Sequence, residues 1–148
     1  MLACSHIFLL TRSASLPMGL WIRCAMHKRF VAFLKSLGFA LQGVVFLLRS
    51  QPNARIHLLA TVLVCTAGAY FHLSRAEWLG IVVAMVLVWS AEAFNTAIEG
   101  LADALHPDPH PGIGRAKDVA AAAVLIAAGG AAAIGMLVFI PHLARCGQ

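Results

Sequence analysis

Residues 78–101 have the sequence WLGIVVAMVLVWSAEAFNTAIEGL. Apolar side chains fill its first half, and its length is near the roughly 20 residues that a helix needs to cross a bilayer. Two ionisable side chains, Glu92 and Glu99, lie in its second half. We therefore predict a membrane-spanning helix that carries carboxylates inside or near the membrane.

The composition of the whole chain also indicates a membrane protein. The 148 residues are 61% hydrophobic and 11% charged, with a mean hydropathy of +0.85. Soluble domains carry about 25% charged residues. Because so short and apolar a chain cannot bury all its apolar side chains in one aqueous core, lipid is the expected solvent.

Two further stretches are long and apolar enough to span the membrane, at about 56–72 and 119–140. Before them, hydrophobic residues recur at helical spacing with polar interruptions, which predicts an amphipathic helix in the membrane interface. The expected fold is an all-α membrane protein with three spans after this helix. The domain covers 29–148, and we assign the leader, 1–28, no function because Met18 or Met26 could equally be the start.

The basic residues cluster near the N-terminus of this chain, whose net charge is +5. Those that precede the first predicted span are Arg12, Arg23, Lys28, Arg29, Lys35, Arg49 and Arg55. This asymmetry predicts a cytoplasmic N-terminus and a multi-pass topology. No aromatic residues interleave with the charges in a nucleic-acid-binding motif, so we expect no nucleic acid partner.

Familiar zinc and nucleotide motifs are missing from the sequence. The four cysteines form no CxxC pair, which argues against both zinc and a disulfide framework. His106 and His110 are four residues apart, but the prolines between them prevent the regular helix that would align them. No GxxxxGK[ST] loop or kinase-type glycine-rich loop is present. Any nucleotide chemistry must therefore use a different architecture.

Four polar residues form a stripe on the central span: Glu92, Asn95, Glu99 and Asp103. Spacings of three and four residues place them on one helical face. Ionisable groups are costly inside a membrane and usually face a polar site. Gathered carboxylates suit Mg²⁺ and the phosphates it bridges, and a buried Glu suits a general base. The structural alternative is hydrogen bonding to neighbouring helices, which four residues in one stripe make less attractive.

A charged segment precedes the third span, with Arg115, Lys117 and Asp118. Arg and Lys can clamp phosphate oxygens, Arg in bidentate fashion. The alternative is that they anchor the helix at the cytoplasmic surface. Asp118 argues against that alternative because an acidic residue contributes little to anchoring.

These segments together carry a resemblance to a known family. Residues 92–99 (EAFNTAIE), followed by Ala102-Asp103, His110-Pro111 and 114–121 (GRAKDVAA), resemble the signature of bacterial diacylglycerol and undecaprenol kinases. These are small integral-membrane lipid kinases. The likeness extends from about Arg29 to Pro141 and includes the stretch NARIH at 53–57.

The resemblance implies a homotrimer in the bacterial inner (plasma) membrane. It implies Mg²⁺ and ATP as the phosphoryl donor, and a membrane lipid alcohol as the acceptor. By match to the motif, Glu92 takes the proton of the acceptor hydroxyl, and Asn95 positions the reacting groups. Glu99 holds Mg²⁺. With Glu92 and Asn95, Arg55 is expected to contact the lipid.

The resemblance also implies a nucleotide site around the loop before the third span. The residues expected there are Glu99, Asp103, His110, Arg115, Lys117 and Asp118. Lys117 is expected near the transferred phosphate, and Asp103 and His110 as supports on the nucleotide side.

The sequence departs from the family pattern at Gln51. Many family members carry a Glu there, just before the first span, as a second metal carboxylate. A neutral amide can coordinate through its carbonyl oxygen, but more weakly, so we expect Gln51 to be a weak metal ligand.

The acceptor lipid and the function class have alternatives. The stretch Arg55-Ile56-His57 looks more like the undecaprenol branch, although diacylglycerol remains open. A small oligomeric transporter with an acidic pathway is a rival function, and a non-catalytic membrane scaffold is another. Neither rival accounts for the full set of motifs.

Overall fold

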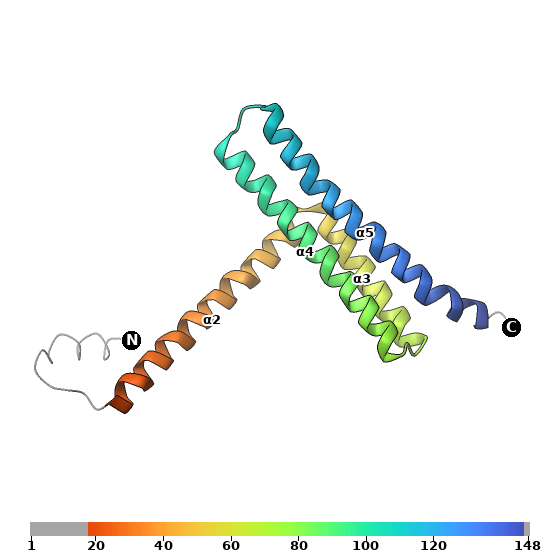
Figure 1. The fold of residues 1–148 in the computed structure, drawn as a ribbon, viewed down its shortest axis with the longest axis horizontal. Helices are drawn as coiled ribbons and strands as arrows, with labels where there is room; N and C mark the ends of the chain where they lie inside the picture. Colours follow the sequence, from red (N-terminus) through yellow and green to blue (C-terminus); the bar gives the residue numbers. More distant parts are fainter. Residues whose placement is uncertain (1–17, 147–148) are drawn as a thin grey trace, which may run out of the picture. The chain divides into compact units, whose positions relative to one another are not determined.

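Four helices make up the part of the chain that the computed structural model describes, residues 18–146, with side chains described from Met26 to Arg145. They are α2 (Met18–Ser50), α3 (Pro52–Tyr70), α4 (Arg75–Leu105) and α5 (Pro111–Cys146) (Figure 1). The predicted all-α class is confirmed. Most of the leader, residues 1–17, lies outside the described residues.

The chain divides between Gly43 and Val44 into two units. The first unit contains most of α2. The second contains the last turns of α2 and the helices α3, α4 and α5, in which α4 packs against both α3 and α5. Figure 1 shows α4 and α5 as an antiparallel pair. All the predicted site residues belong to this second unit.

Three stretches of described helix are long and apolar enough to cross a membrane: Met26–Ser50, Arg75–Leu105 and Pro111–Arg145. Of these stretches, those in α4 and α5 contain the predicted second and third spans. The first of the three stretches lies in α2, which we expected at the membrane interface. Helix α3 is not among the three, because the polar residues of its first turns lower its mean hydropathy. The first span at about 56–72, in α3, stays a prediction.

The junction between α2 and α3 is held by Arg55. Pro52 occupies the first turn of α3, where its missing N–H costs no helical hydrogen bond. The Arg55 guanidinium donates to the carbonyl oxygens of Leu48 (3.0 Å) and Arg49 (2.6 Å). These carbonyls lack partners within α2, so Arg55 satisfies the end of that helix.

The start of α4 is fixed by a capping box. The Ser74 hydroxyl accepts from the backbone N–H of Glu77 (3.4 Å), and the Glu77 carboxylate accepts from the backbone N–H of Ser74 (2.7 Å). The same carboxylate lies 2.9 Å from the His142 ring of α5. Glu77 therefore both starts α4 and ties it to α5.

We expect Ser74→Ala to lower stability by about 1 kcal/mol, because it removes the hydroxyl that accepts from the orphan backbone N–H of Glu77. The change is measured as a lower thermal midpoint of the purified protein in detergent micelles. Ser50→Ala is the matched control, since the Ser50 hydroxyl only donates to the Phe46 carbonyl of its own helix. Equal midpoints for the two variants would show that the capping box does not stabilise α4.

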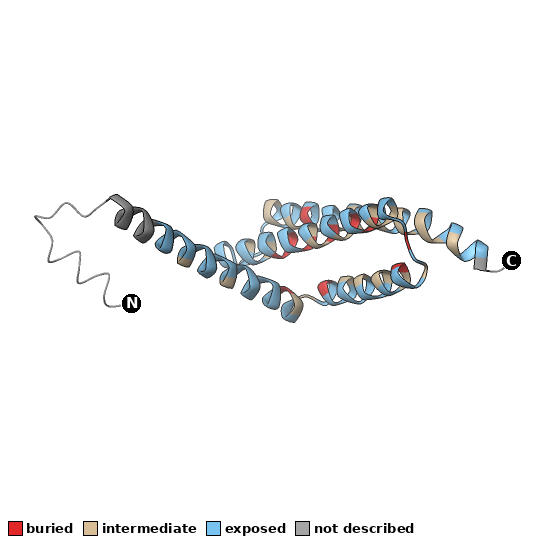
Figure 2. Ribbon diagram, turned by 90° about the horizontal axis from the view of Figure 1, so that it is seen from below, coloured by how far each residue is buried: buried red, intermediate tan, exposed pale blue. Residues whose placement is uncertain are grey.

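Buried positions on α4 recur at helical spacing and end in polar residues. They are Ile81, Ala84, Val88, Glu92, Asn95 and Thr96. Figure 2 shows such buried positions (red) within helices whose surface is otherwise mostly exposed. The exposed surface includes large apolar side chains such as Leu125 and Leu137. An apolar exterior around a partly polar interior is the arrangement expected of helices surrounded by lipid.

Glycine permits the close approach of α3 and α4. A Cβ atom at Gly68 would lie 2.8 Å from the Trp78 ring and 3.1 Å from Leu73. Any larger residue at position 68 would therefore have to displace the Trp78 ring. His72, in that turn, adopts a positive φ of 52°.

Candidate functional site

Glu92 is the largest fully buried side chain of the described residues, with 1% of its surface exposed. Neither of its carboxylate oxygens has a hydrogen-bond partner among the described side chains. The nearest basic group is the His57 ring of α3, whose Nε2 lies 4.0 Å from Glu92 Oε2 and is itself buried without a partner. That distance is too long for a hydrogen bond. Buried polar groups without partners are costly, so the pair calls for a functional explanation.

A second polar cluster lies about two turns along α4, around Glu99. The Asn95 amide donates to Glu99 Oε1 (3.0 Å), and the Gln51 amide approaches Glu99 Oε2 at 3.5 Å. Gln51 precedes Pro52 in the α2–α3 junction, far from Glu99 in sequence. The structure thus brings together Glu99, predicted to bind the metal, Gln51, predicted to be a weak metal ligand, and Asn95, predicted to position the reacting groups.

Asp103 and Lys117 join α4 to α5 across the loop between them. Lys117 Nζ lies 2.6 Å from Asp103 Oδ1, and the aspartate side chain is largely exposed. An exposed ion pair adds little stability. Its clearer consequence is to hold the lysine near the end of α4 that carries Glu99.

The remaining predicted nucleotide residues lie at the start of α5. Arg115 and Asp118 are exposed. His110 accepts through Nδ1 from the backbone N–H of Gly112 (3.1 Å), and its ring lies 5.4 Å from that of His106. His110 therefore orders the beginning of α5, while Arg115 is free to meet a ligand from outside.

The hydrogen bonds of Arg55 involve neither the Glu92 cluster nor the Glu99 cluster. Its guanidinium is engaged by the carbonyls at the end of α2, and the side chain is exposed. Its expected contact with the lipid stays a prediction.

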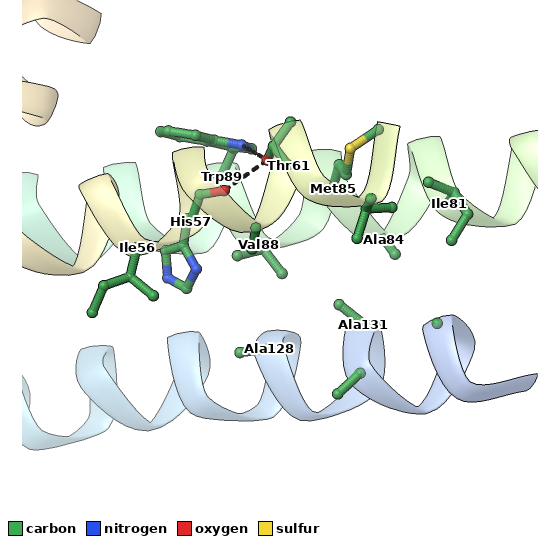
Figure 3. Close-up of a pocket in the computed structure, with 14 residues that line it drawn as sticks. Ile56, His57, Thr61, Ile81, Ala84, Met85, Val88, Trp89, Ala128 and Ala131 are labelled. Carbon is green, nitrogen blue, oxygen red and sulfur yellow. Dashed lines mark hydrogen bonds between the residues drawn. The ribbon is translucent and has the colours of Figure 1, made fainter. Parts of the chain in front are cut away.

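A cavity of about 380 Å³ lies between α3, α4 and α5. Figure 3 shows Ile56 and His57 toward one end and Ile81 toward the other, with Ala128 and Ala131 of α5 across from them. The Trp89 indole donates to the Thr61 hydroxyl (3.1 Å), which donates to the His57 carbonyl (2.8 Å). These polar groups satisfy one another and leave the cavity wall largely apolar.

His57 is the residue for which sequence reasoning found no role. It appeared only as part of the NARIH stretch and of the likeness to the undecaprenol branch, and one histidine near the start of a predicted span carries no clear signal. Its position opposite Glu92 depends on how α3 packs against α4.

Comparison with known proteins identifies the family. The chain matches the prokaryotic diacylglycerol kinases over residues 38–139. The chain belongs to this family. The match contains the clusters around Glu92, Glu99 and Lys117, and it confirms the resemblance that the motifs indicated. As a member of this family, the protein is a lipid kinase with several membrane helices. An enzyme is therefore favoured over the transporter and the scaffold.

Individual relatives of this lipid kinase agree with that assignment. The chain is 36% identical over 111 residues to an undecaprenol kinase of Bacillus subtilis, covering 75% of this chain and 90% of the relative. It is 34% identical over 111 residues to a diacylglycerol kinase of Synechocystis, covering 74% of this chain and 63% of the relative. A diacylglycerol kinase of Escherichia coli K12 is 28% identical over 98 residues, which cover 66% of this chain and 80% of the relative.

Proposed function

We propose that this lipid kinase transfers the terminal phosphate of ATP, in the presence of Mg²⁺, to the hydroxyl of a membrane lipid alcohol. The observation that carries the proposal is the buried, unpartnered carboxylate of Glu92 beside a second polar cluster on the same helix. The acceptor is undecaprenol or diacylglycerol, the lipids named for the relatives, and undecaprenol is the first choice because the undecaprenol kinase match covers most of both chains.

Glu92 is the general base of this proposal. Its carboxylate takes the proton of the acceptor hydroxyl as that oxygen bonds to the terminal phosphorus and the bond to the departing ADP breaks. Because no described group donates a hydrogen bond to the Glu92 carboxylate, its oxygens are free to accept this proton. Asn95, one turn away, orients Glu99 and with it the reacting groups.

The residues around Glu99 fit Mg²⁺. This ion is usually held by one or two carboxylates together with substrate phosphates, and it keeps several waters. Glu99 supplies one carboxylate, and the Gln51 amide 3.5 Å away can turn to present its oxygen. The ion would neutralise phosphate charge at this position. Among the described residues no group of three His, Cys, Asp or Glu side chains gathers there, so substrate phosphates and waters would supply the remaining ligands.

The nucleotide is proposed to bind at the start of α5. Arg115 and Lys117 supply positive charge for phosphate oxygens, Arg115 in bidentate fashion. The ion pair with Asp103 holds Lys117 toward the end of α4. Asp118 and His110 support the same region, His110 through its contact with the backbone of Gly112.

The proposed setting is the cytoplasmic face of a bacterial inner membrane, with the kinase assembled as a homotrimer. The concentration of basic residues before the first predicted span supports a cytoplasmic N-terminus. With the topology expected from the sequence, the loop between α4 and α5 returns to the same face, where ATP is available. The trimer rests on the likeness to the family.

The test of the function is phosphate transfer from labelled ATP by purified protein in mixed micelles. Undecaprenol and diacylglycerol are offered separately, with and without Mg²⁺. Labelled lipid phosphate from one of them is expected. Failure of the folded protein to label either lipid would refute the proposed function, and ATP-independent conduction in vesicles would favour transport instead.

We expect Gln51→Glu to lower the Mg²⁺ concentration that gives half-maximal activity by about 30-fold. One added unit charge about 4 Å from a divalent cation in aqueous surroundings contributes about 2 kcal/mol. The measurement is a Mg²⁺ titration of lipid phosphorylation at fixed ATP. Gln42→Glu, at an exposed position on α2, is the matched control and should not change the titration. An unchanged requirement in Gln51→Glu would remove residue 51 from the metal site.

A further inference from the structure

We infer that His57 holds the acceptor hydroxyl against Glu92 by donating a hydrogen bond to its oxygen, with the part of the apolar tail nearest the hydroxyl in the adjoining cavity. This inference rests on the proposed function, because it places a substrate beside the proposed base. It adds a second residue in contact with the reacting atoms and assigns an occupant to the cavity.

The spacing of the His57–Glu92 pair suits one bridging oxygen atom, although both atoms are fully buried and the two side chains must part to admit it. Nε2 and Oε2 lie 4.0 Å apart, and both are buried without a hydrogen-bond partner among the described side chains. A hydroxyl oxygen placed about 2.8 Å from each atom makes two hydrogen bonds of ordinary length. One such oxygen would satisfy both groups at once, and thereby remove the cost of leaving them unpaired.

A hydroxyl group has the donor and acceptor pattern that this gap requires. The hydroxyl donates its proton to the Glu92 carboxylate and accepts from the N–H of a neutral His57 ring that carries its hydrogen on Nε2. The first hydrogen bond aligns the proton with the base that removes it. The second orients a lone pair of the oxygen, so that another remains free to attack phosphorus.

The cavity continues from His57 along the helices as an apolar path. Its volume is about 380 Å³, and alanine and glycine on α5 provide the room: Ala128, Ala131, Ala132 and Gly135. In Figure 3, the polar atoms of Thr61 and Trp89 are paired with each other, and the His57 ring lies near one end. A ligand that reaches His57 through this cavity therefore needs a polar end and an apolar chain, as a lipid alcohol has.

His57→Phe tests the hydrogen bond, because it keeps a ring and removes its donor. We expect kcat/KM for the lipid alcohol to fall about 10- to 100-fold, the range for leaving a buried polar group unpaired. The KM for MgATP should change less than about twofold, since His57 does not contact the Glu99 cluster. His142→Phe, at the other end of the bundle, is the matched control and should keep the kcat/KM of the unmodified chain.

Two amide variants separate hydrogen bonding from packing. The glutamine amide nitrogen can replace His57 Nε2 more closely than the shorter asparagine can, so His57→Gln should recover part of the activity and His57→Asn should not. A kcat/KM for lipid in His57→Phe equal to that of the unmodified chain would overturn the inference. Equal losses in the Gln and Phe variants would also overturn it.

The tail site has its own test. Ala131→Leu places a larger side chain in the cavity wall and should raise the KM for a long-chain lipid alcohol more than for a short-chain alcohol. Ala133→Leu, at an exposed position on the same helix, should leave the ratio of the long-chain KM to the short-chain KM unchanged. An unchanged ratio in Ala131→Leu would overturn the tail assignment. Absence of lipid phosphorylation by the unmodified chain would instead refute the underlying function, so the two failures are distinguishable.

Discussion

Glu92→Gln is expected to abolish most lipid phosphorylation, with kcat falling about 10²- to 10⁴-fold, the range for loss of a general base. Glutamine has the size and shape of glutamate but cannot take the proton of the acceptor hydroxyl. The measurement is the turnover of labelled ATP into lipid phosphate in mixed micelles, at saturating lipid and MgATP. A variant that kept more than about a tenth of kcat would exclude Glu92 as the base.

The loss in Glu92→Gln should not come from unfolding. Both carboxylate oxygens lack hydrogen-bond partners among the described residues, so an amide there breaks no hydrogen bond that the structure shows. Burying a neutral amide also costs less than burying a charge. The thermal midpoint of the variant is therefore expected to equal or exceed that of the unmodified chain.

Glu77→Gln is the matched control because it makes the same chemical change on the same helix. Glu77 accepts from the backbone of Ser74 and lies 2.9 Å from His142, so its carboxylate has structural partners. We expect this control to lower the thermal midpoint and to keep kcat. Opposite effects on activity and stability at the two positions would separate chemistry from folding.

The second large effect is expected for Glu99→Gln. At about 1 mM Mg²⁺, activity should fall about 100-fold, because the site would lose its carboxylate and hold the ion with amides alone. Raising the Mg²⁺ concentration should restore part of the activity. This recovery distinguishes weakened metal binding from a lost base, since added Mg²⁺ should not rescue Glu92→Gln.

The Glu99→Gln experiment needs a control for loss of one negative charge. Asp108→Asn serves, because Asp108 is exposed in the loop between α4 and α5 and has no assigned role. Its Mg²⁺ titration should match that of the unmodified chain. If Glu99→Gln kept the Mg²⁺ requirement of the unmodified chain, Glu99 would not be a metal ligand.

The sequence alone determined the features that depend on local periodicity and composition. Apolar stretches of the right length predicted membrane helices at about 78–101 and 119–140, because a bilayer demands roughly 20 apolar residues whatever lies beside them. Offsets of three and four residues predicted that Glu92, Asn95 and Glu99 share a helical face, since the α-helix repeats every 3.6 residues.

The tertiary structure alone decided which residues meet across helices. The position of Gln51 beside Glu99, and of His57 opposite Glu92, depends on how α3 packs against α4. Arg55 donates to the carbonyls at the end of α2, and small residues on α5 line a cavity that no motif marks. Helical periodicity specifies the face that a side chain occupies, but not the partner helix or the register at which that face packs. Those are set by the summed contacts of many side chains across the interface, so they appear only in the folded structure.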